Sequence, residues 1–331
     1  MKTAPNVYLL CGEASGDLHA ANLVAAWKQL NPDISFRAWG GDRLQAEGVQ
    51  IDKHIRELSF MGFWEVFKNL PLIRKQFKTI QNQLLSQKPD LLVLVDYPGF
   101  NLRMAKWAKD HGIRVLYYIS PTVWAWKQKR VYQIQKNVDQ LFCILPFEPA
   151  FYAKFGVSVK YFGHPLLDEI KRHQSRASVA KDSDKPVLAL LPGSRKQELE
   201  RILPIMLQAS KALEKSHQIV LVCAPHIPLS YYQSFELSPE LVCAQSHTYD
   251  TLQRADMALV TSGTATLETA LFEVPQVVCY KSSGLSIWLA KKIVNIKYIS
   301  LVNLILDKLV VTELIQETCT VEHMTLELKK I

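Results

Sequence analysis

The most constraining feature of this chain is a local pattern that occurs twice in its second half: an apolar run, a glycine-containing loop and a helix-like segment. In the first copy Val187–Leu190 precedes the loop Leu191–Arg195, and in the second Met257–Val260 precedes Thr261–Glu268. A short apolar run bounded by turn residues is typical of a parallel strand that is buried on both faces. A glycine turn that leads into a helix points free backbone N–H groups and the positive end of the helix dipole at one place, where anions bind. The pattern therefore predicts a parallel α/β sheet with two anion sites, an arrangement suited to a diphosphate.

The polar side chains of the two loops favour a nucleotide as the bound anion. Arg195 offers a guanidinium, which binds phosphate through two hydrogen bonds. Glu268 lies one turn into its helix, where a carboxylate could accept hydrogen bonds from ribose hydroxyls. The predicted donor-binding residues of these loops are Gly193, Ser194, Arg195, Ser262, Gly263, Thr264 and Glu268. A simpler interpretation is that the two glycines only permit tight turns, because glycine adopts positive φ without steric cost.

Strand-like and helix-like segments alternate along the chain. The expected strands are Val7–Cys11, Ile34–Trp39, Leu91–Val95, Arg114–Ile119, Gln140–Leu145, Val187–Leu190, Gln218–Cys223, Glu240–Ala244, Met257–Val260 and Gln276–Tyr280. This alternation predicts the α/β class, with two doubly wound Rossmann-like domains facing a cleft. We expect the domains to be residues 1–168 and 169–331, with a charged linker region over Lys171–Lys185.

Charge and cysteine usage narrow the partners and the compartment. A net charge of +8 favours an anionic partner, without choosing among nucleotide, phosphorylated substrate, nucleic acid and membrane surface. The basic residues are dispersed, so we expect no nucleic-acid partner. The six cysteines and nine histidines show no metal-ligand or redox spacing, which predicts no metal and a reduced, cytoplasmic compartment. We also expect no signal peptide and no apolar run of the ~18 residues that span a membrane.

Six motifs then occur in a recognisable order: Gly12–Asp17, Asp96–Asn101, Ser120–Trp126, Leu145–Glu148, Leu191–Arg195 and Ser262–Glu268. In this order they resemble the lipid-A-disaccharide synthase family, and the first and third motifs are specific to it. The resemblance implies a GT-B type glycosyltransferase of lipid A (lipopolysaccharide) biosynthesis. Such an enzyme moves a diacylglucosamine unit from UDP-2,3-diacylglucosamine to the hydroxyl on carbon 6 of 2,3-diacylglucosamine 1-phosphate. The resemblance also implies an inverting reaction that gives a β-1,6 disaccharide without a cofactor or a required metal.

The chain departs from the family pattern at Gly99, where many members carry a second acidic residue. A general base at that position therefore cannot be carried over. Members also commonly continue beyond the position that matches Ile331. Two other UDP-sugar enzymes share the glycine loops, the undecaprenyl-linked glucosaminyltransferase and a UDP-sugar 2-epimerase, but the motifs of the first half argue against both. A dehydrogenase is disfavoured because no Gly-x-Gly-x-x-Gly motif follows the first strand.

Inverting transfer needs a base that takes the proton of the acceptor hydroxyl. Asp96 directly follows an apolar strand, at the carboxyl end where open α/β sheets bind ligands. Glu13 and Asp17 are rivals after the first strand, and Ser15 suits a turn that closely approaches the acceptor. The structural alternatives are that Asp96 accepts hydrogen bonds from turn N–H groups and that Asp17 stabilises its own helix. Asn303 is a donor-site candidate, or equally a polar cap.

Apolar residues from Phe60 to Leu85 follow helical spacing, with a break expected at Pro71. Basic residues are interleaved with them: Lys68, Arg74, Lys75 and Lys78. Leu285–Lys297 has a similar character. An ordinary amphipathic helix packed on a core would give this pattern. A helix that meets the membrane surface would give it as well, and the acylated substrates that the resemblance implies favour this interpretation. We therefore expect an anionic membrane surface as a partner, with the protein peripherally associated with the inner membrane, and we leave a homodimer open.

Overall fold

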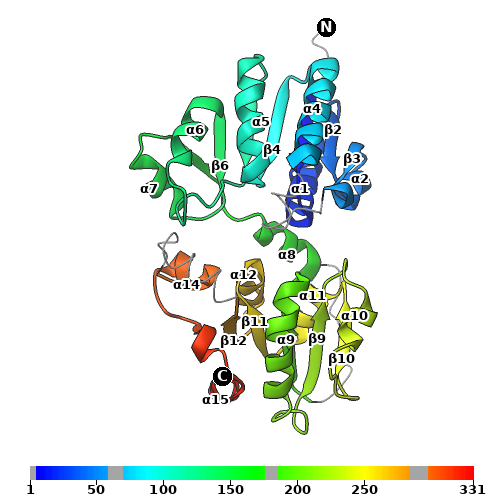
Figure 1. The fold of residues 1–331 in the computed structure, drawn as a ribbon, viewed down its shortest axis with the longest axis vertical. Helices are drawn as coiled ribbons and strands as arrows, with labels where there is room; N and C mark the ends of the chain where they lie inside the picture. The colour runs from blue at the N-terminus through cyan, green and yellow to red at the C-terminus, as the bar shows by residue number, and fades with distance from the viewer. Residues whose placement is uncertain (1–4, 59–69, 176–184, 283–296) are drawn as a thin grey trace. The chain divides into compact units, whose positions relative to one another are not determined.

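The computed structural model describes residues 5–58, 70–175, 185–282 and 297–331. The chain divides into two compact units, Met1–Pro165 (unit 1) and Leu166–Ile331 (unit 2) (Figure 1). The boundary that the sequence suggests, after residue 168, falls inside the first helix of unit 2. Each unit is built on one parallel sheet with helices on both faces, which confirms the predicted doubly wound fold class.

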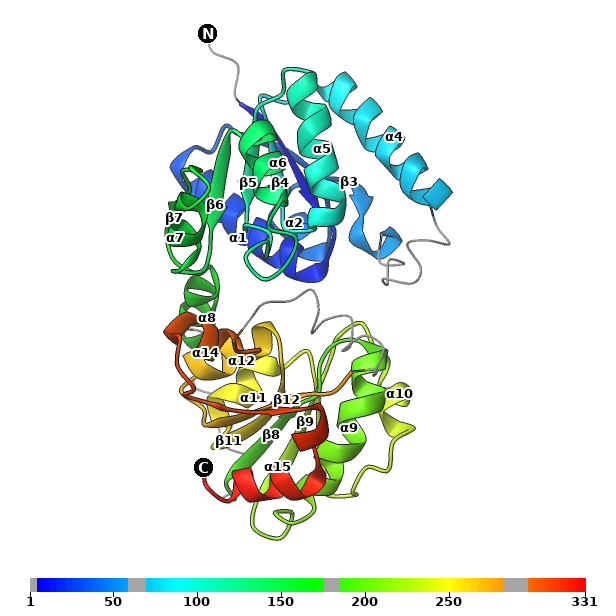
Figure 2. The ribbon, with the colours of Figure 1, turned by 60° about the vertical axis from the view of Figure 1, so that its left-hand side comes forward.

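Unit 1 contains a seven-stranded sheet in the order β3-β2-β1-β4-β5-β6-β7. Its strands are β1 (Asn6–Cys11), β2 (Ser35–Gly40), β3 (Gln50–His54), β4 (Leu91–Val95), β5 (Val115–Tyr118), β6 (Gln140–Cys143) and β7 (Lys160–Tyr161). Its helices are α1 (Ala14–Leu30), α2 (Asp42–Ala46), α4 (Leu70–Gln87), α5 (Pro98–Asp110), α6 (Arg130–Asn137) and α7 (Glu148–Ala153). Helices α4, α5 and α6 stand side by side on one face of the sheet, whereas α1 and α2 pack together on the other (Figure 2).

The central strands of unit 1 are apolar because helices cover both of their faces. Leu92–Val95 of β4 is fully buried, as are Tyr8 and Leu9 of the neighbouring β1. Strands of a doubly wound sheet accordingly read as continuous apolar runs rather than as alternating ones. The order of the strands reverses between β1 and β4, which pair directly through Cys11 and Val95. The ends of these two strands therefore form the topological switch point of unit 1.

Unit 2 contains a six-stranded parallel sheet in the order β10-β9-β8-β11-β12-β13. Its strands are β8 (Val187–Leu191), β9 (Gln218–Cys223), β10 (Val242–Gln245), β11 (Met257–Thr261), β12 (Gln276–Tyr280) and β13 (Thr312–Ile315). Its helices are α8 (Leu166–Gln174), α9 (Lys196–Ser210), α10 (Leu229–Gln233), α11 (Thr248–Arg254), α12 (Thr264–Leu271), α14 (Leu301–Leu306) and α15 (Val321–Leu328). Strands β8 and β11 pair directly at the point where the strand order reverses, so their ends form the switch point of unit 2.

The two amphipathic segments expected to meet a membrane lie partly outside the described residues. Of the first, residues 60–69 fall in an undescribed range, and the rest forms most of α4, with Pro71 as its second residue. Of the second, residues 285–296 are likewise not described. Among the helices that the structure describes, none combines the length and the apolar character needed to cross a bilayer.

Candidate active site

Most of the predicted site residues lie at the two switch points, where doubly wound sheets bind their ligands, whereas Asn303 lies on α14, between β12 and β13. In unit 1, Glu13 follows β1 and Asp96 follows β4, the two adjacent central strands. In unit 2, the loop containing Gly193 follows β8 and the loop containing Gly263 follows β11. Each switch point thus brings together two segments that are far apart in the sequence.

Asp96 sits in a backbone conformation that few residues other than glycine adopt. Its φ is 45°, and that of the next residue, Tyr97, is 50°. Two neighbouring side chains hold this turn through the carbonyl oxygen of Asp96. The hydroxyl of Tyr117, on β5, donates to that oxygen at 2.6 Å, and Asn101 Nδ2, on α5, donates to it at 2.7 Å. Two left-handed residues in succession are strained, and such strain persists where surrounding contacts over-determine it, typically at functional sites.

The first family motif contributes to the same turn through a missing side chain. A Cβ atom placed on Gly12 would lie 2.4 Å from Cγ of Tyr97, which is far inside van der Waals contact. The ring of Tyr97 also stacks on Phe100, at 5.9 Å between centroids. Glycine at position 12 is therefore required for β1 and the Asp96 turn to approach each other this closely.

The surroundings of Asp96 suit a base. Burial, and secondarily the negative charge of Glu13, raise the pKa of the Asp96 carboxyl to about 6, while a hydrogen bond from the backbone of Tyr97 opposes the shift. A carboxylate with a pKa near neutrality is a stronger proton acceptor than an ordinary one and is still ionised at pH 7. Glu13 is exposed and caps α1 by position, without a capping hydrogen bond from its side chain. Ser15 is exposed in the first turn of the same helix.

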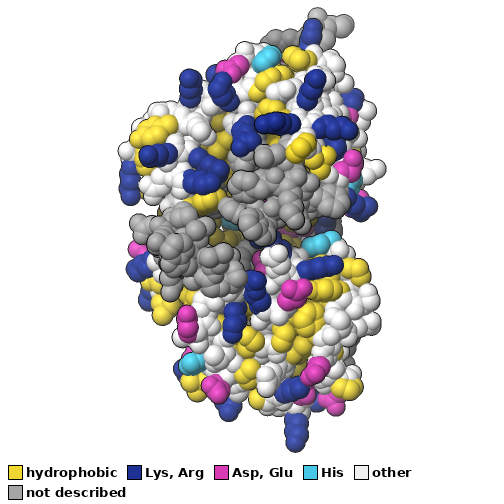
Figure 3. All heavy atoms as spheres, in the orientation of Figure 1, with side chains coloured by type: hydrophobic (Ala, Val, Ile, Leu, Met, Phe, Trp, Pro, Cys, Tyr) yellow, Lys and Arg dark blue, Asp and Glu magenta, His cyan; other side chains and the backbone are white. Residues whose placement is uncertain are grey.

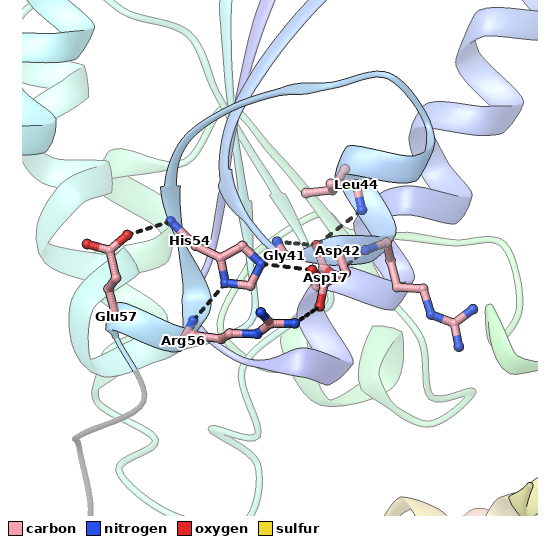
Figure 4. Close-up of polar contacts among 8 residues, drawn as sticks. Asp17, Gly41, Asp42, Leu44, His54, Arg56 and Glu57 are labelled. Carbon is pink, nitrogen blue, oxygen red and sulfur yellow. Dashed lines mark hydrogen bonds and ion pairs between the residues drawn. The ribbon is translucent and has the colours of Figure 1, made fainter. Parts of the chain in front are cut away.

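Asp17 has a different environment from the other two carboxylates, as Figure 4 shows. It is buried, and its oxygens accept hydrogen bonds from the backbone N–H groups of Gly41 at 2.6 Å and Arg43 at 3.0 Å. These groups lie at the start of α2, where a negative charge is stabilised by the helix dipole. The structural alternative from the sequence was that Asp17 stabilises its own helix, α1. In the structure its carboxylate instead binds the backbone at the start of α2. This geometry favours the structural alternative for Asp17.

The first loop of unit 2 presents a cation at the start of α9. Gly193 has a φ of 103°, and a Cβ atom there would lie 2.6 Å from Oε2 of Glu198, so the position requires glycine. Arg195 occupies the N-cap of α9, and its side chain is 74% exposed with one Glu198 oxygen at 3.6 Å. The backbone carbonyl of Ser194 lies 2.9 Å from Nε2 of His226. An exposed guanidinium beside a helix N-terminus is well placed to bind a diphosphate.

The second loop combines an open helix end with two side chains that have protein partners. Gly263 is the N-cap of α12 and, with Thr264, is exposed. The hydroxyl of Ser262 donates to the carbonyl oxygen of Ile299 at 2.8 Å. Glu268 accepts a hydrogen bond from the hydroxyl of Tyr249 at 3.1 Å, and burial raises the pKa of its carboxyl.

Asn303 has no hydrogen-bonding capacity left for a ligand. Its side chain is fully buried; its Nδ2 donates to the carbonyl of Val311 and to Glu313, both at 2.9 Å. Its Oδ1 accepts from the backbone N–H groups of Val310 at 2.8 Å and Val311 at 3.0 Å. An amide can make four such bonds, and all four are used to fold the segment after α14. This favours the cap role that the sequence left open.

Asn101 and Tyr117 were not singled out as site residues by the sequence, although both control the Asp96 turn. Asn101 belongs to the second family motif, and an amide five residues after a candidate base was the available signal. Tyr117 lies inside an apolar strand, and no sequence signal marked it, because its partner Asp96 is distant in the sequence. Within the ranges that the structure describes, no group of three or more His, Cys, Asp or Glu side chains could hold a metal ion.

Known proteins with a similar fold include enzymes that act on nucleotide sugars. The UDP-GlcNAc 2-epimerase of Methanocaldococcus jannaschii, solved in complex with UDP-GlcNAc and UDP, aligns with 98% of this chain and 92% of its own. Its TM-score is 0.66 at 13% identity. The glycotransferase of kitacinnamycin gives 0.66 at 12% identity, with 98% and 89% of the two chains covered. At these identities the likeness establishes the fold, which is that of GT-B glycosyltransferases and epimerases.

Sequence relatives are much closer. The family model described as lipid-A-disaccharide synthetase matches residues 7–331. The lipid-A-disaccharide synthase of Myxococcus xanthus is 39% identical over 342 residues, covering 100% of this chain and 89% of the relative. Lipid-A-disaccharide synthase 1 of Legionella pneumophila (strain Lens) is 39% identical over 331 residues, covering 96% and 86%. This chain, with its two Rossmann-like units, therefore belongs to the lipid-A-disaccharide synthase family of glycosyltransferases.

Proposed function

We propose that unit 1 binds the acylated acceptor, that unit 2 binds the UDP moiety of the donor, and that Asp96 is the general base. The reaction joins UDP-2,3-diacylglucosamine to 2,3-diacylglucosamine 1-phosphate and releases UDP, as expected of this family. The observation that carries the assignment is the different chemistry of the two switch points. The one in unit 1 holds a half-buried carboxylate with a raised pKa, and the one in unit 2 holds a cation and open helix ends.

In the proposed mechanism, the Asp96 carboxylate takes the proton from the hydroxyl on carbon 6 of the acceptor. The acceptor oxygen then forms a bond to the anomeric carbon of the donor from the face opposite the diphosphate. The bond between that carbon and the UDP oxygen breaks, so the configuration inverts and the electron pair leaves with UDP. Arg195 and the N–H groups at the starts of α9 and α12 stabilise the charge that develops on the leaving diphosphate.

We assign the diphosphate to the loops containing Gly193, Ser194 and Arg195 and containing Ser262, Gly263 and Thr264. We assign Glu268 to the ribose, whose hydroxyls would donate to its carboxylate; the hydrogen bond from the Tyr249 hydroxyl supports this by orienting that carboxylate. Asn303 supports this site indirectly, because it fixes the segment after α14. No resident cofactor enters the scheme, since the UDP-sugar is itself the substrate.

We further propose that the protein works in the cytoplasm, peripherally bound to the inner membrane where its acylated substrates reside. Helix α4 supports this, since it exposes the cations Arg74, Lys75 and Lys78 together with Leu72. Basic side chains contribute about 1 kcal/mol each near an anionic surface. Binding to anionic vesicles should therefore weaken between 0.1 M and 1 M salt, as the Debye length falls from ~10 Å to ~3 Å. Equal co-sedimentation with neutral and anionic vesicles would contradict this account.

A homodimer stays a prediction, for which the exposed apolar residues Leu306, Leu309 and Val310 offer a surface. Analytical ultracentrifugation decides between a monomer and a dimer.

The transferase activity is tested by incubating the protein with both acylated substrates and detecting the disaccharide 1-phosphate and UDP by mass spectrometry. UDP-N-acetylglucosamine serves as a parallel substrate for epimerase activity. Disaccharide formation without epimerisation is the expected result, and epimerisation alone would overturn the proposal.

A further inference from the structure

A groove of about 580 Å³ runs along the surface of unit 1 between α4, α5 and α6. Its lining combines two kinds of side chain: the apolar Ile73, Phe77 and Leu102, and the cationic Arg74, Lys78 and Arg103. The face that carries these helices shows dark blue Lys and Arg side chains around yellow hydrophobic ones (Figure 3). A groove with this lining matches a ligand that has both an apolar chain and a negative charge.

Further cations gather at the start of α6, the helix that forms one wall of this groove. Lys127 Nζ lies 4.4 Å from the ring centroid of Trp126, and the guanidinium carbon of Arg130 lies 5.5 Å from it. Partial burial lowers the pKa of Arg130; the neighbouring Tyr117 opposes this shift, and the positive charge of Arg103 adds to it. Burial, and secondarily the positive charge of Arg130, lower the pKa of Lys127. Lys127 and Arg130 thus share the Trp126 ring, and Arg103 lies on α5, the helix that packs against α6.

These three cations have no carboxylate partner in the part of the chain that the structure describes. Neighbouring like charges destabilise a fold unless an anion compensates them. A phosphomonoester carries a charge of about −1.5 to −2 at neutral pH and presents three acceptor oxygens. It would neutralise the cluster formed by Arg103, Lys127 and Arg130.

The cluster is linked to the candidate base through one buried side chain. The hydroxyl of Tyr117 donates to the backbone carbonyl of Asp96 at 2.6 Å. Tyr117 also lies within electrostatic range of both Asp96 and Arg130. In the acceptor sugar, carbon 1 and carbon 5, which bears carbon 6, both adjoin the ring oxygen. A sugar whose carbon-6 hydroxyl meets Asp96 therefore holds its 1-phosphate only a few bonds away, where cations near Tyr117 can bind it.

We propose that Arg103, Lys127 and Arg130 bind the 1-phosphate of the acylated acceptor, while one of its acyl chains lies along Ile73, Phe77 and Leu102. This assignment rests on the proposed function and adds the subsite that recognises the acceptor phosphate. It makes these cations determinants of acceptor specificity. An acceptor without the phosphate would leave the cluster uncompensated and bind poorly.

The kinetic test uses the full chain, two acceptors and matched variants. The acceptors are 2,3-diacylglucosamine 1-phosphate and the methyl glycoside of 2,3-diacylglucosamine, presented in the same neutral detergent micelles. The variants are Arg130→Gln and Arg103→Gln, with Lys136→Gln as control, because Lys136 is an exposed cation on the same helix as Arg130. Loss of one charged hydrogen-bond donor should raise the KM for the phosphorylated acceptor by about tenfold or more. The KM for the donor, the rates with the methyl glycoside and all constants of Lys136→Gln should stay unchanged.

An equal effect of Arg130→Gln on both acceptors would overturn the phosphate assignment. So would a loss of binding to phosphatidylglycerol vesicles with an unchanged KM for the phosphorylated acceptor, because the cluster would then be a membrane contact.

A binding measurement separates this proposal from the proposed function. Dodecyl phosphate and dodecyl glucoside are titrated into the protein by calorimetry, below their micelle concentrations and without donor. Wild type and Lys136→Gln should bind the phosphate more tightly than the glucoside, and Arg130→Gln should lose this preference. Equal affinity of wild type and Arg130→Gln for dodecyl phosphate would overturn the site. A wild-type protein that binds dodecyl phosphate but forms no disaccharide would overturn the proposed function and leave the site in place.

Discussion

Replacing Asp96 by asparagine should remove most of the transferase activity and at the same time stabilise the protein at neutral pH. Burial and the neighbouring Glu13 raise the pKa of Asp96 from 3.8 to about 6. The folded state therefore binds the proton of the Asp96 carboxyl more tightly than the unfolded chain does. As a consequence, the free energy of unfolding falls while the pH rises from about 4 to about 6, and stays lower above that range.

The size of the effect follows from the same pKa difference. Raising the pKa of Asp96 from 3.8 to about 6 corresponds to about 2–3 kcal/mol of unfolding free energy at pH 7. Asparagine carries no charge, so the variant does not lose this energy as the pH rises. Its amide oxygen can still accept the backbone hydrogen bond from Tyr97 that the carboxylate receives. The turnover should fall by roughly 10²–10⁴, which is the usual contribution of a general base.

Urea denaturation followed by tryptophan fluorescence at pH 4 and pH 7.5 measures the stability. The Asp96→Asn variant should unfold at a higher urea concentration than wild type at pH 7.5 and at nearly the same concentration at pH 4. Asp33→Asn is the matched control, because Asp33 is an exposed carboxylate of the same unit, and it should change neither midpoint. A variant that is no more stable than wild type at pH 7.5, or equally stabilised at both pH values, would refute the argument from burial.

Three further predictions concern the two switch points. The wild-type kcat/KM should fall as the pH drops through about 6, because Asp96 must be ionised to act as the base. The Glu13→Gln variant should show this fall at a lower pH, because it removes a negative charge that raises the pKa of Asp96. If Glu13→Gln instead loses all activity at every pH, Glu13 is the base. Arg195→Ala should weaken UDP binding by ~1.5–3 kcal/mol in calorimetry, the range for a charged hydrogen bond, and an unchanged affinity in a folded variant would remove Arg195 from the site. Gly12→Ala should lower both activity and thermal stability, because the added Cβ would lie 2.4 Å from the Tyr97 ring. In Gly99→Ala the added Cβ meets nothing within 4 Å, so this variant should gain ~0.5–1 kcal/mol of helix stability. Equal activity and stability of the two variants would contradict the steric argument.

The sequence predicted the central strands well and, of the four strands at the sheet edges, only β10. Strands β4, β9 and β12 have the predicted bounds, because apolar residues fill positions that helices cover on both sides. Strands β3, β7 and β13 were not predicted. Their sequences contain no long apolar run, since each lies at the edge of its sheet and draws its hydrogen bonds from one neighbouring strand rather than from a local pattern.

For the candidate site, the sequence located the loops but could not distinguish the roles of its carboxylates. Asp17 and Asp96 both follow central strands of one sheet and look alike as residue types. Asp17 receives N–H groups from a segment more than twenty positions away, which satisfies its charge. Asp96 lies in a half-buried turn, where loss of solvent and secondarily the charge of Glu13 raise the pKa of its carboxyl. The difference lies in long-range partners, and a local motif contains no information about them.

By itself, the sequence determined the family, the two parallel sheets and the glycine loops after their central strands, because apolar runs and glycine turns act over a few neighbouring residues. Only the tertiary structure decided which polar groups are occupied by the fold and which remain candidates for chemistry. Asn303 uses all its hydrogen bonds within unit 2, whereas the Asp96 turn is held by Asn101 on the following helix and Tyr117 on a neighbouring strand. Hydrogen bonds and burial of this kind depend on which segments meet in space, and only the folded chain brings those segments together.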